Sequence, residues 1–349
     1  MWTRESLHQL VAEKFRDYTF VVVSNREPYI HSHISGAIQC DMPPSGLTAA
    51  LDPIMRACGG TWIAHGSGNA DRETVDERDR VRVPPDDPHY TLRRLWLSKE
   101  EEDAYYYGFS NDALWPLCHI AYTRPTFNET EWSIYRAVNE RFSEAVLEEV
   151  GTRKAFVFVQ DYHLTLMPRL LRQANPNLVI AQFWHIPWPN PEAFRVCPWQ
   201  ADILRGLLGN HLLGFHLRYH CNNFLDTVDR AIEARVDRDR YEVTHGGEKT
   251  AIRPFPISVD FEEVNRRAQE KDVLVEMQRL KKSLEIKGKF VGMGLDRIDY
   301  TKGIPDRLRA FDRFLERYPD YRNRVVFIQT GVPSRVHVPA YRRINDEID

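Results

Sequence analysis

Short apolar runs alternate with longer stretches of helical spacing along most of the chain. Runs rich in β-branched and aromatic residues occur at 19–24, 61–65, 155–159, 178–184 and 212–215. Runs of this length without polar alternation are typical of parallel strands that are buried on both faces. Further strands are predicted at 91–97 and 249–257, and helices at 47–58, 131–150, 164–173 and 263–285, with a short helix beginning at 100. We therefore predict an α/β fold, a doubly wound parallel sheet covered by helices.

Two stretches of the N-terminal half show no such periodicity. The chain from Asn25 to Gly46 is rich in Gly, Pro and Ser, and we predict a long loop there. Residues 71–88 are charged and contain prolines, which indicates an excursion over the surface.

Polar side chains stand directly after many of the predicted strands. In a doubly wound sheet the ligand crevice lies outside the carboxyl ends of the strands. The sequence therefore predicts a site at that edge, and the residues that reach it are Arg26, His65, Asp161, His163, His185, His216 and Arg297.

The stretch 294–305 combines a strand end, two cations and a helix start. It follows the apolar run 289–293 and precedes a helical pattern at 306–318, with Arg297 and Lys302 in the loop between them. Side-chain cations and unpaired helix N–H groups can together hold a phosphate. Two solvated cations that flank acidic residues remain an alternative interpretation.

Composition narrows the class of protein. Hydrophobic residues make up 42% and charged residues 28% of the 349 residues, and 47 basic against 50 acidic side chains give a formal charge of −3. This balance argues against nucleic acid as the main partner. The five cysteines form no C-x-x-C pair, so we expect a reduced, cytoplasmic protein. The N-terminus does not resemble a signal peptide, and no apolar stretch approaches the roughly 20 residues of a membrane span.

Structural roles compete with functional ones at several of these positions. Asp161 could cap the N-terminus of a helix, because its side chain can accept bonds from the first N–H groups. His163 or His185 alone could be a hydrogen-bonded structural histidine. Tyr106 and Trp115 lie in a segment dense in aromatic residues, where packing in the core is the simpler explanation.

Five segments, taken in order, resemble one family. The chain is similar to the trehalose-6-phosphate synthases from about residue 19 to its end. The resemblance implies a GT-B architecture, with two Rossmann-like domains at 1–257 and 258–349, the second incomplete. The matching segments are Ser24-Asn25-Arg26, Phe109-Ser110-Asn111 with Leu114-Trp115-Pro116, Asp161-Tyr162-His163, His185-Ile186-Pro187-Trp188-Pro189, and Arg297 to Gly303.

The resemblance also implies an activity and a set of site residues. Such enzymes move glucose from a nucleotide diphosphate glucose, here expected to be UDP-glucose, to glucose 6-phosphate with retention and without a metal or other cofactor. The implied catalytic residues are Asp161, His185, Arg297 and Lys302. The implied donor-binding residues are Gly46, His185, Arg297 and Lys302, and the implied acceptor-binding residues are Arg26, Tyr106, Trp115, Asp161 and Arg335.

Three departures from the family pattern keep alternatives open. The usual Gly-Gly of the first loop is Ser45-Gly46, and His65 stands where a tryptophan lining the acceptor is expected. The acidic segment by which members of this family bind the donor is not found up to Asp349. A sister enzyme with another phosphorylated acceptor, or a sugar-phosphate sensor without catalysis, therefore remains an alternative. The partners expected are small-molecule substrates, not nucleic acid or membrane, and a homo-oligomer is left open.

Overall fold

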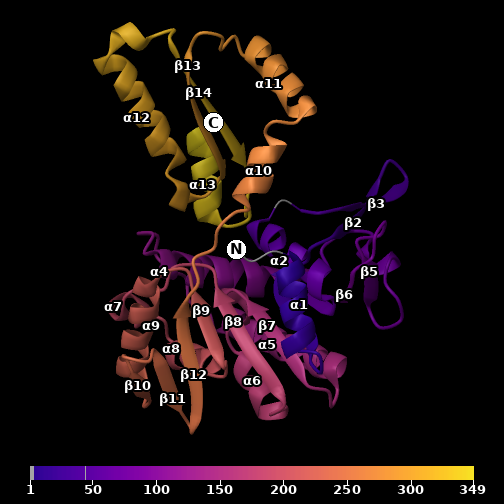
Figure 1. The fold of residues 1–349 in the computed structure, drawn as a ribbon. Helices are drawn as coiled ribbons and strands as arrows, with labels where there is room; N and C mark the ends of the chain where they lie inside the picture. The colour runs from indigo at the N-terminus through magenta and orange to yellow at the C-terminus, as the bar shows by residue number, and fades with distance from the viewer. Residues whose placement is uncertain (1–3, 44) are drawn as a thin grey trace. The chain divides into compact units, whose positions relative to one another are not determined.

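The computed structural model describes residues 4–43 and 45–349. The chain divides into two compact units, Met1–Pro256 and Ile257–Asp349, which are described separately. Figure 1 shows the ribbon of both units with their helices and strands labelled.

The first unit is built on a mixed sheet that, in the described part, has ten strands. Its order is β10-β11-β12-β9-β8-β7-β1-β4-β6-β5. From β12 to β6 every neighbouring pair is parallel, whereas β5, β10 and β11 pair antiparallel at the two margins. The predicted parallel sheet is therefore the centre of a larger mixed one. The bounds are β1 (Thr19–Arg26), β4 (Thr61–His65), β5 (Arg80–Val83), β6 (Tyr90–Leu95), β7 (Ala155–Gln160), β8 (Leu178–Trp184), β9 (Leu212–Phe215), β10 (Arg235–Asp237), β11 (Glu242–His245) and β12 (Glu248–Pro254).

Helices with one apolar stripe cover this sheet. Helix α5 shows how the sequence specifies them: Trp132, Tyr135, Phe142 and Val146 recur at helical spacing and are buried, and the side chain of Asn128 accepts the N–H groups of the first turn. The helices of the unit are α1 (Arg4–Lys14), α2 (Gly46–Cys58), α3 (Lys99–Glu102), α4 (Trp115–His119), α5 (Glu129–Val150), α6 (Met167–Ala174), α7 (Pro191–Phe194), α8 (Gln200–Leu207) and α9 (Arg218–Ala231).

Two predictions for the N-terminal half are wrong. The supposed loop after β1 contains an antiparallel hairpin of β2 (Ile30–Ile34) and β3 (Ala37–Asp41). Its turn residues Ser35 and Gly36 have φ of 52° and 82°, the pattern of a tight hairpin turn with two residues at positive φ. The charged stretch 71–88 is only partly a surface excursion: it begins with the short helix η1 (Asp71–Glu73), whose Asp71 is fully buried, and it contains β5.

The aromatic segment after β6 has an unusual backbone. The capping box of Ser98 and Glu101 starts α3, which then continues as the π-helix η2 (Asp103–Leu114) and ends as α4. The sequence predicts only a short helix here. A π-helix has a wider turn than an α-helix and is often found at functional sites.

The second unit is smaller. Its parallel strands β13 (Phe290–Arg297) and β14 (Val325–Val332) pair along their whole length. Around them lie α10 (Phe261–Arg267), α11 (Lys271–Ser283), η4 (Tyr300–Lys302), α12 (Ile304–Arg317), η5 (Pro319–Tyr321) and α13 (Pro339–Ile348). The single helix predicted at 263–285 is thus two helices. Much apolar surface on β13 is exposed, as at Phe290 and Met293, which are 60% and 70% accessible.

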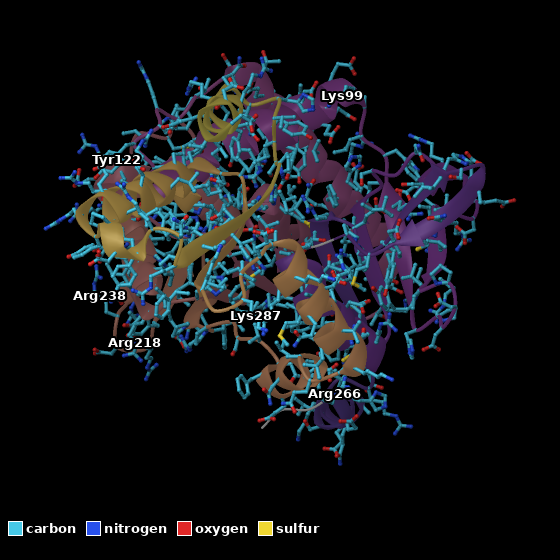
Figure 2. The ribbon with its side chains drawn as sticks, turned by 90° about the horizontal axis from the view of Figure 1, so that it is seen from above. Lys99, Tyr122, Arg218, Arg238, Arg266 and Lys287 are labelled. Carbon is cyan, nitrogen blue, oxygen red and sulfur yellow. The ribbon has the colours of Figure 1, made fainter. Side chains whose placement is uncertain are left out.

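Surface charges of both signs are paired locally. Lys99, Arg238 and Arg266, labelled among the outer side chains in Figure 2, each form an ion pair with a carboxylate nearby in the sequence or on a neighbouring turn. Among residues 4–43 and 45–349, no helix has the length and apolar character needed to cross a membrane.

Candidate active site

The carboxyl ends of four neighbouring strands bring predicted site residues to one edge of the first unit. Strands β4, β1, β7 and β8 are adjacent and parallel. Arg26 ends β1 and is the register partner of His65, which ends β4. Asp161 follows β7 directly, and His185 follows β8. The topology therefore gathers side chains that lie up to 159 positions apart in the sequence (Arg26 to His185).

Asp161 occupies a backbone conformation that side chains rarely adopt. Its φ is 66° and its ψ is −175°, a region used almost only by glycine, and such strain is typical of functional sites. Its N–H donates to the carbonyl of Phe183, and its Oδ1 accepts the N–H of His185 at 3.2 Å. Asp161 precedes the short helix η3 (Tyr162–Leu164), yet its side chain makes no capping bond there. The helix-cap alternative therefore does not explain this residue.

His185 is held as a neutral imidazole. Its Nε2 lies 3.0 Å from Oε1 of Gln160, and its ring packs against Phe183 and His216. Burial, reinforced by the neighbouring His216, lowers the pKa of His185 to about 3. The side chain can exchange hydrogen bonds with a sugar hydroxyl at neutral pH but cannot supply a positive charge.

Tyr106 and Trp115 come from the π-helix and from the first residue of α4. Tyr106 is half-buried and stacks on His163 at 5.5 Å, and Trp115 packs on His119 at 4.1 Å. Asn111 ties this segment to the strand ends, because its Nδ2 donates to the Tyr106 carbonyl at 2.6 Å and its Oδ1 accepts from the Tyr162 hydroxyl at 2.8 Å. This tie was not predicted, although Asn111 stands in one of the matching segments.

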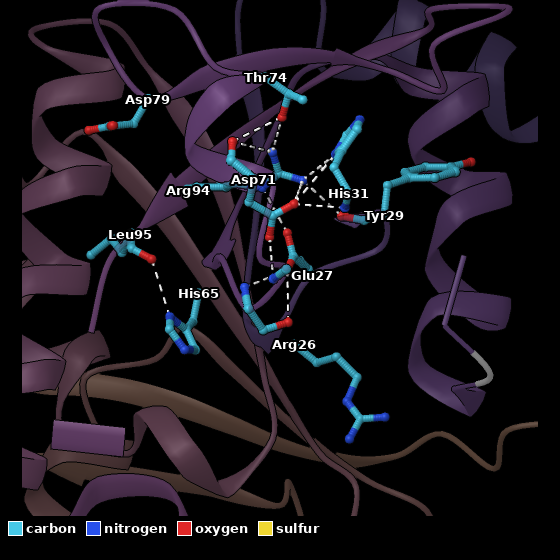
Figure 3. Close-up of polar contacts among 12 residues, drawn as sticks. Arg26, Glu27, Tyr29, His31, His65, Asp71, Thr74, Asp79, Arg94 and Leu95 are labelled. Atoms are coloured by element: carbon cyan, nitrogen blue, oxygen red, sulfur yellow. Dashed lines mark hydrogen bonds and ion pairs between the residues drawn. The ribbon is translucent and has the colours of Figure 1, made fainter. Parts of the chain in front are cut away.

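A buried ionic network anchors the segments that follow Arg26 and His65 at the ends of β1 and β4. Arg94 donates from Nε to Glu27 at 2.8 Å and from Nη2 to Asp71 at 2.8 Å, and none of these three side chains is accessible to solvent. Figure 3 shows this cluster with the Arg26 side chain turned away from it. We call Glu27, Asp71 and Arg94 the Arg94 network. The sequence showed Glu27 next to Arg26 but gave no sign that Arg94 and Asp71 would meet it.

His65 lies beside this network as a half-buried side chain. Its Nδ1 is 3.2 Å from the carbonyl oxygen of Leu95. Burial lowers the pKa of His65, which favours the neutral ring. The position that departs from the family pattern thus presents a polar but uncharged surface.

The second unit gathers cations at the end of β13. Arg297 is the last residue of that strand, Lys302 ends η4, and Gly303, with φ of 61°, leads into helix α12. Arg335, which follows β14, has a side chain only 6% exposed. Arg297 and Arg335 both approach the buried carboxylate of Asp299, at 3.5 and 3.9 Å. Basic groups and a helix N-terminus are therefore close together, as the sequence predicts for a phosphate site.

Gly46 is the exposed first residue of α2. A Cβ placed there would meet no atom within 4 Å. The described residues contain no group of three or more His, Cys, Asp or Glu side chains arranged to hold a metal ion.

Comparison with known proteins gives the class. The sequence model of glycosyltransferase family 20 matches residues 18–349, and the chain belongs to this family.

The similar curated proteins have a more specific name. A trehalose-6-phosphate synthase of Mycobacterium avium (strain 104) is 38% identical over 338 residues, covering 95% of this chain and 67% of the relative. That of Mycobacterium ulcerans (strain Agy99) is 36% identical over 354 residues, covering 99% and 69%. The chain thus spans about two thirds of the length of these relatives.

Solved structures agree on the fold. The E. coli protein bound with UDP-2-fluoro glucose superposes with a TM-score of 0.79 at 27% identity, over 95% of this chain and 68% of that one. The Burkholderia xenovorans α,α-trehalose-phosphate synthase (UDP-forming) in complex with glucose-6-phosphate gives 0.78 at 25% identity, over 94% and 69%. The predicted family and the predicted GT-B fold with an incomplete second domain are confirmed.

Proposed function

We propose that this protein transfers glucose from UDP-glucose to glucose 6-phosphate, with retention at the anomeric carbon, to give α,α-trehalose 6-phosphate and UDP. Its family, the names of its relatives and the ligands of its structural neighbours all support this reaction.

The observation that carries the proposal is the cluster of cations in the second unit. When the glycosidic bond of the donor breaks, negative charge builds on the departing diphosphate. Fixed donors aimed at developing charge are usually the largest catalytic contribution. The position of Arg297 at the end of β13 and of Lys302 at the entry to α12 supports this role for both. We propose that they bind the diphosphate of the donor, in place of a metal ion.

The acceptor side combines aromatic and cationic groups. In this proposal Tyr106 and Trp115 line the sugar, and Arg26 and Arg335 bind its phosphate. Two guanidinium groups suit a phosphate because each can form paired hydrogen bonds with its oxygens. We propose that Gly46, which has no side chain, lets the backbone at the start of α2 approach the donor closely.

Asp161 and His185 are the residues proposed beside the reacting sugars. The neutral ring of His185 is suited to bonding a hydroxyl of the donor glucose. One carboxylate oxygen of Asp161 accepts the backbone N–H of His185, which fixes the orientation of the Asp161 side chain. We propose that the acceptor hydroxyl attacks on the face from which UDP departs, without a covalent glucosyl-enzyme, and that Asp161 orients the sugars.

The test is a product analysis with the full-length gene product. Purified protein receives UDP-glucose and glucose 6-phosphate, UDP release is followed by a coupled assay, and the anomeric couplings of the disaccharide phosphate are read by NMR. The proposal predicts UDP release that depends on glucose 6-phosphate and an α,α-linked product. No acceptor-dependent UDP release, or a product of inverted configuration, refutes it.

His65 favours a second candidate, a sister enzyme with another phosphorylated acceptor. It replaces the expected tryptophan with a smaller polar ring next to the strand end of Arg26. A panel of phosphorylated sugars, polyols and cyclitols, each with its unphosphorylated form, separates the two. Higher kcat/KM for a different phosphate acceptor supports the second candidate, and equal use of unphosphorylated acceptors contradicts the roles given to Arg26 and Arg335.

A further inference from the structure

One buried carboxylate in the second unit contacts both of the arginines assigned to different substrates. Asp299 has no accessible side-chain surface. Its Oδ2 lies 3.5 Å from Nη2 of Arg297 and 3.9 Å from Nη1 of Arg335. Its Oδ1 accepts bonds from the N–H and the hydroxyl of Thr301, at 2.9 and 2.8 Å, which fix the rotation of the carboxylate.

A tyrosine from helix α13 completes this cluster. Nη1 of Arg335 donates to the hydroxyl oxygen of Tyr341 at 2.6 Å, and that hydroxyl donates to Oδ2 of Asp299 at 3.1 Å. The Tyr341 side chain is fully buried, and the guanidinium of Arg335 lies over its ring at 5.4 Å. Burial raises the pKa of Tyr341 above its usual value, so the hydroxyl keeps its proton.

The geometry differs from that of a simple ion pair. Arg335 has φ of 51°, so its backbone is strained and its side chain needs contacts that hold it. The relay Arg335–Tyr341–Asp299 provides them, and the same Asp299 oxygen faces Arg297. A shift of either arginine toward a bound anion therefore alters the contacts of Asp299, including its contact with the other arginine.

We propose that Asp299 and Tyr341 are positioning residues that hold Arg297 and Arg335 in binding geometry and thereby couple the donor-diphosphate site to the acceptor-phosphate site. This inference rests on the proposed function, which assigns Arg297 to the donor and Arg335 to the acceptor. Neither Asp299 nor Tyr341 touches substrate in it.

Tyr341→Phe and Asp299→Asn test the relay with almost no change of volume. The first removes the hydroxyl that holds Arg335, and a hydrogen bond to a charged group contributes enough to change affinity about tenfold or more. We expect KM for glucose 6-phosphate to rise about tenfold, with KM for UDP-glucose and kcat changing less than threefold. In Asp299→Asn an amide N–H₂ faces the two arginines, so both KM values should rise. Coupling of the two sites predicts that bound UDP increases the affinity of wild type for glucose 6-phosphate in calorimetry, and this increase should disappear in Asp299→Asn.

Matched controls keep the result specific. Tyr318→Phe alters a half-exposed tyrosine in the same unit, and Asp320→Asn alters an exposed carboxylate in η5. Both are expected to leave KM, kcat and the effect of UDP within twofold of wild type. Thermal melting of all four variants shows whether each one folds.

The proposal is overturned if folded Tyr341→Phe keeps its KM for glucose 6-phosphate within twofold of wild type, or if Asp299→Asn retains the effect of UDP. Failure of the proposed function looks different, since wild type itself then forms no product. In that case binding of inorganic phosphate and pyrophosphate to wild type and to the two variants tests the relay alone. Wild-type affinity for both anions in both variants refutes it.

Discussion

Replacing Arg94 with methionine should destabilise the first unit strongly. Methionine approximates the aliphatic stem but removes a guanidinium that is fully buried. Nε and Nη2 of Arg94 bind Glu27 and Asp71 at 2.8 Å each, and Nη2 also donates to the carbonyl of Tyr29 at 3.0 Å. The substitution leaves two carboxylates inside the protein without the cation that they share.

The magnitude follows from that imbalance. Breaking a buried ion pair by removing one partner costs about 3–5 kcal/mol, because the remaining charge is neither solvated nor compensated. We expect the free energy of unfolding to fall by about 4 kcal/mol at pH 8, a large share of the 5–15 kcal/mol typical of a folded domain. Urea unfolding monitored by tryptophan fluorescence measures it, with Arg78→Met, at an exposed arginine, as the control that should change stability by less than about 0.5 kcal/mol.

The pH dependence gives a sharper test. Burial raises the pKa of Glu27 to about 7, and the Arg94 charge opposes that rise. Between its unfolded value of 4.5 and about 7, folded Glu27 binds more proton than unfolded Glu27, so its contribution to stability falls as the pH rises through this window. Without Arg94 the pKa of Glu27 rises further. When the pH is lowered from 8 to 5, the free energy of unfolding of Arg94→Met should therefore increase more than that of wild type. A loss below about 1 kcal/mol at pH 8, or a gap that widens on acidification, refutes this reasoning.

Other predictions concern the proposed chemistry. Arg297→Ala should lower kcat by the equivalent of about 3 kcal/mol while KM for glucose 6-phosphate changes little; steady-state kinetics checks this, and an effect on the acceptor alone contradicts the donor assignment. Asp161→Asn keeps an oxygen that can accept the His185 N–H, so it should melt as wild type does but turn over more slowly. His185 has a folded pKa of about 3 and an unfolded value of 6.5, so wild type should lose stability as the pH falls through that range, and His185→Gln should lack this part of the loss in acid unfolding curves. Dialysis against EDTA should leave turnover unchanged, whereas restoration of lost activity by Mg²⁺ or Mn²⁺ contradicts the role given to Arg297 and Lys302.

Hydrophobic periodicity was sufficient for the central strands and not for the margins of the sheet. The parallel strands are near-continuous apolar runs, as at Val21 to Val23, where every side chain is buried. Strand β5 alternates polar with apolar residues over only four positions. Strands β2 and β3 show neither a continuous apolar run nor regular alternation, and only the Ser35-Gly36 turn marked that hairpin locally. The π-helix was not predicted: its residues Tyr105 and Phe109 pack against Tyr135 of α5, and the local sequence does not show contacts between separate segments.

The candidate site also combines residues that the sequence predicts with residues that it does not. Position at the end of an apolar strand was enough to select Arg26, Asp161 and His185, because the parallel strands of the first unit end at a common edge. The same pattern selected Arg297 at the end of β13 in the second unit. The residues that support these side chains, such as Asp71 and Arg94, show no comparable sequence pattern. Asp71 stood in a stretch predicted to cover the surface, but it is buried where its carboxylate meets Arg94, the backbone N–H of His31 in β2 and that of the nearby Gly68.

The two buried acidic clusters differ in a way that bears on function. In the Arg94 network two carboxylates share one guanidinium at 2.8 Å and no member is accessible, so its charges are committed to the fold. Around Asp299 the ratio of carboxylates to guanidinium groups is reversed. One carboxylate lies 3.5 and 3.9 Å from two arginines, distances beyond the usual length of a charge-assisted hydrogen bond. Contacts that long can be exchanged for phosphate oxygens at small cost. We therefore interpret the Arg94 network as a fixed support for the segments that follow Arg26 and His65. We interpret the cluster around Asp299 as two arginines positioned to bind an anionic ligand.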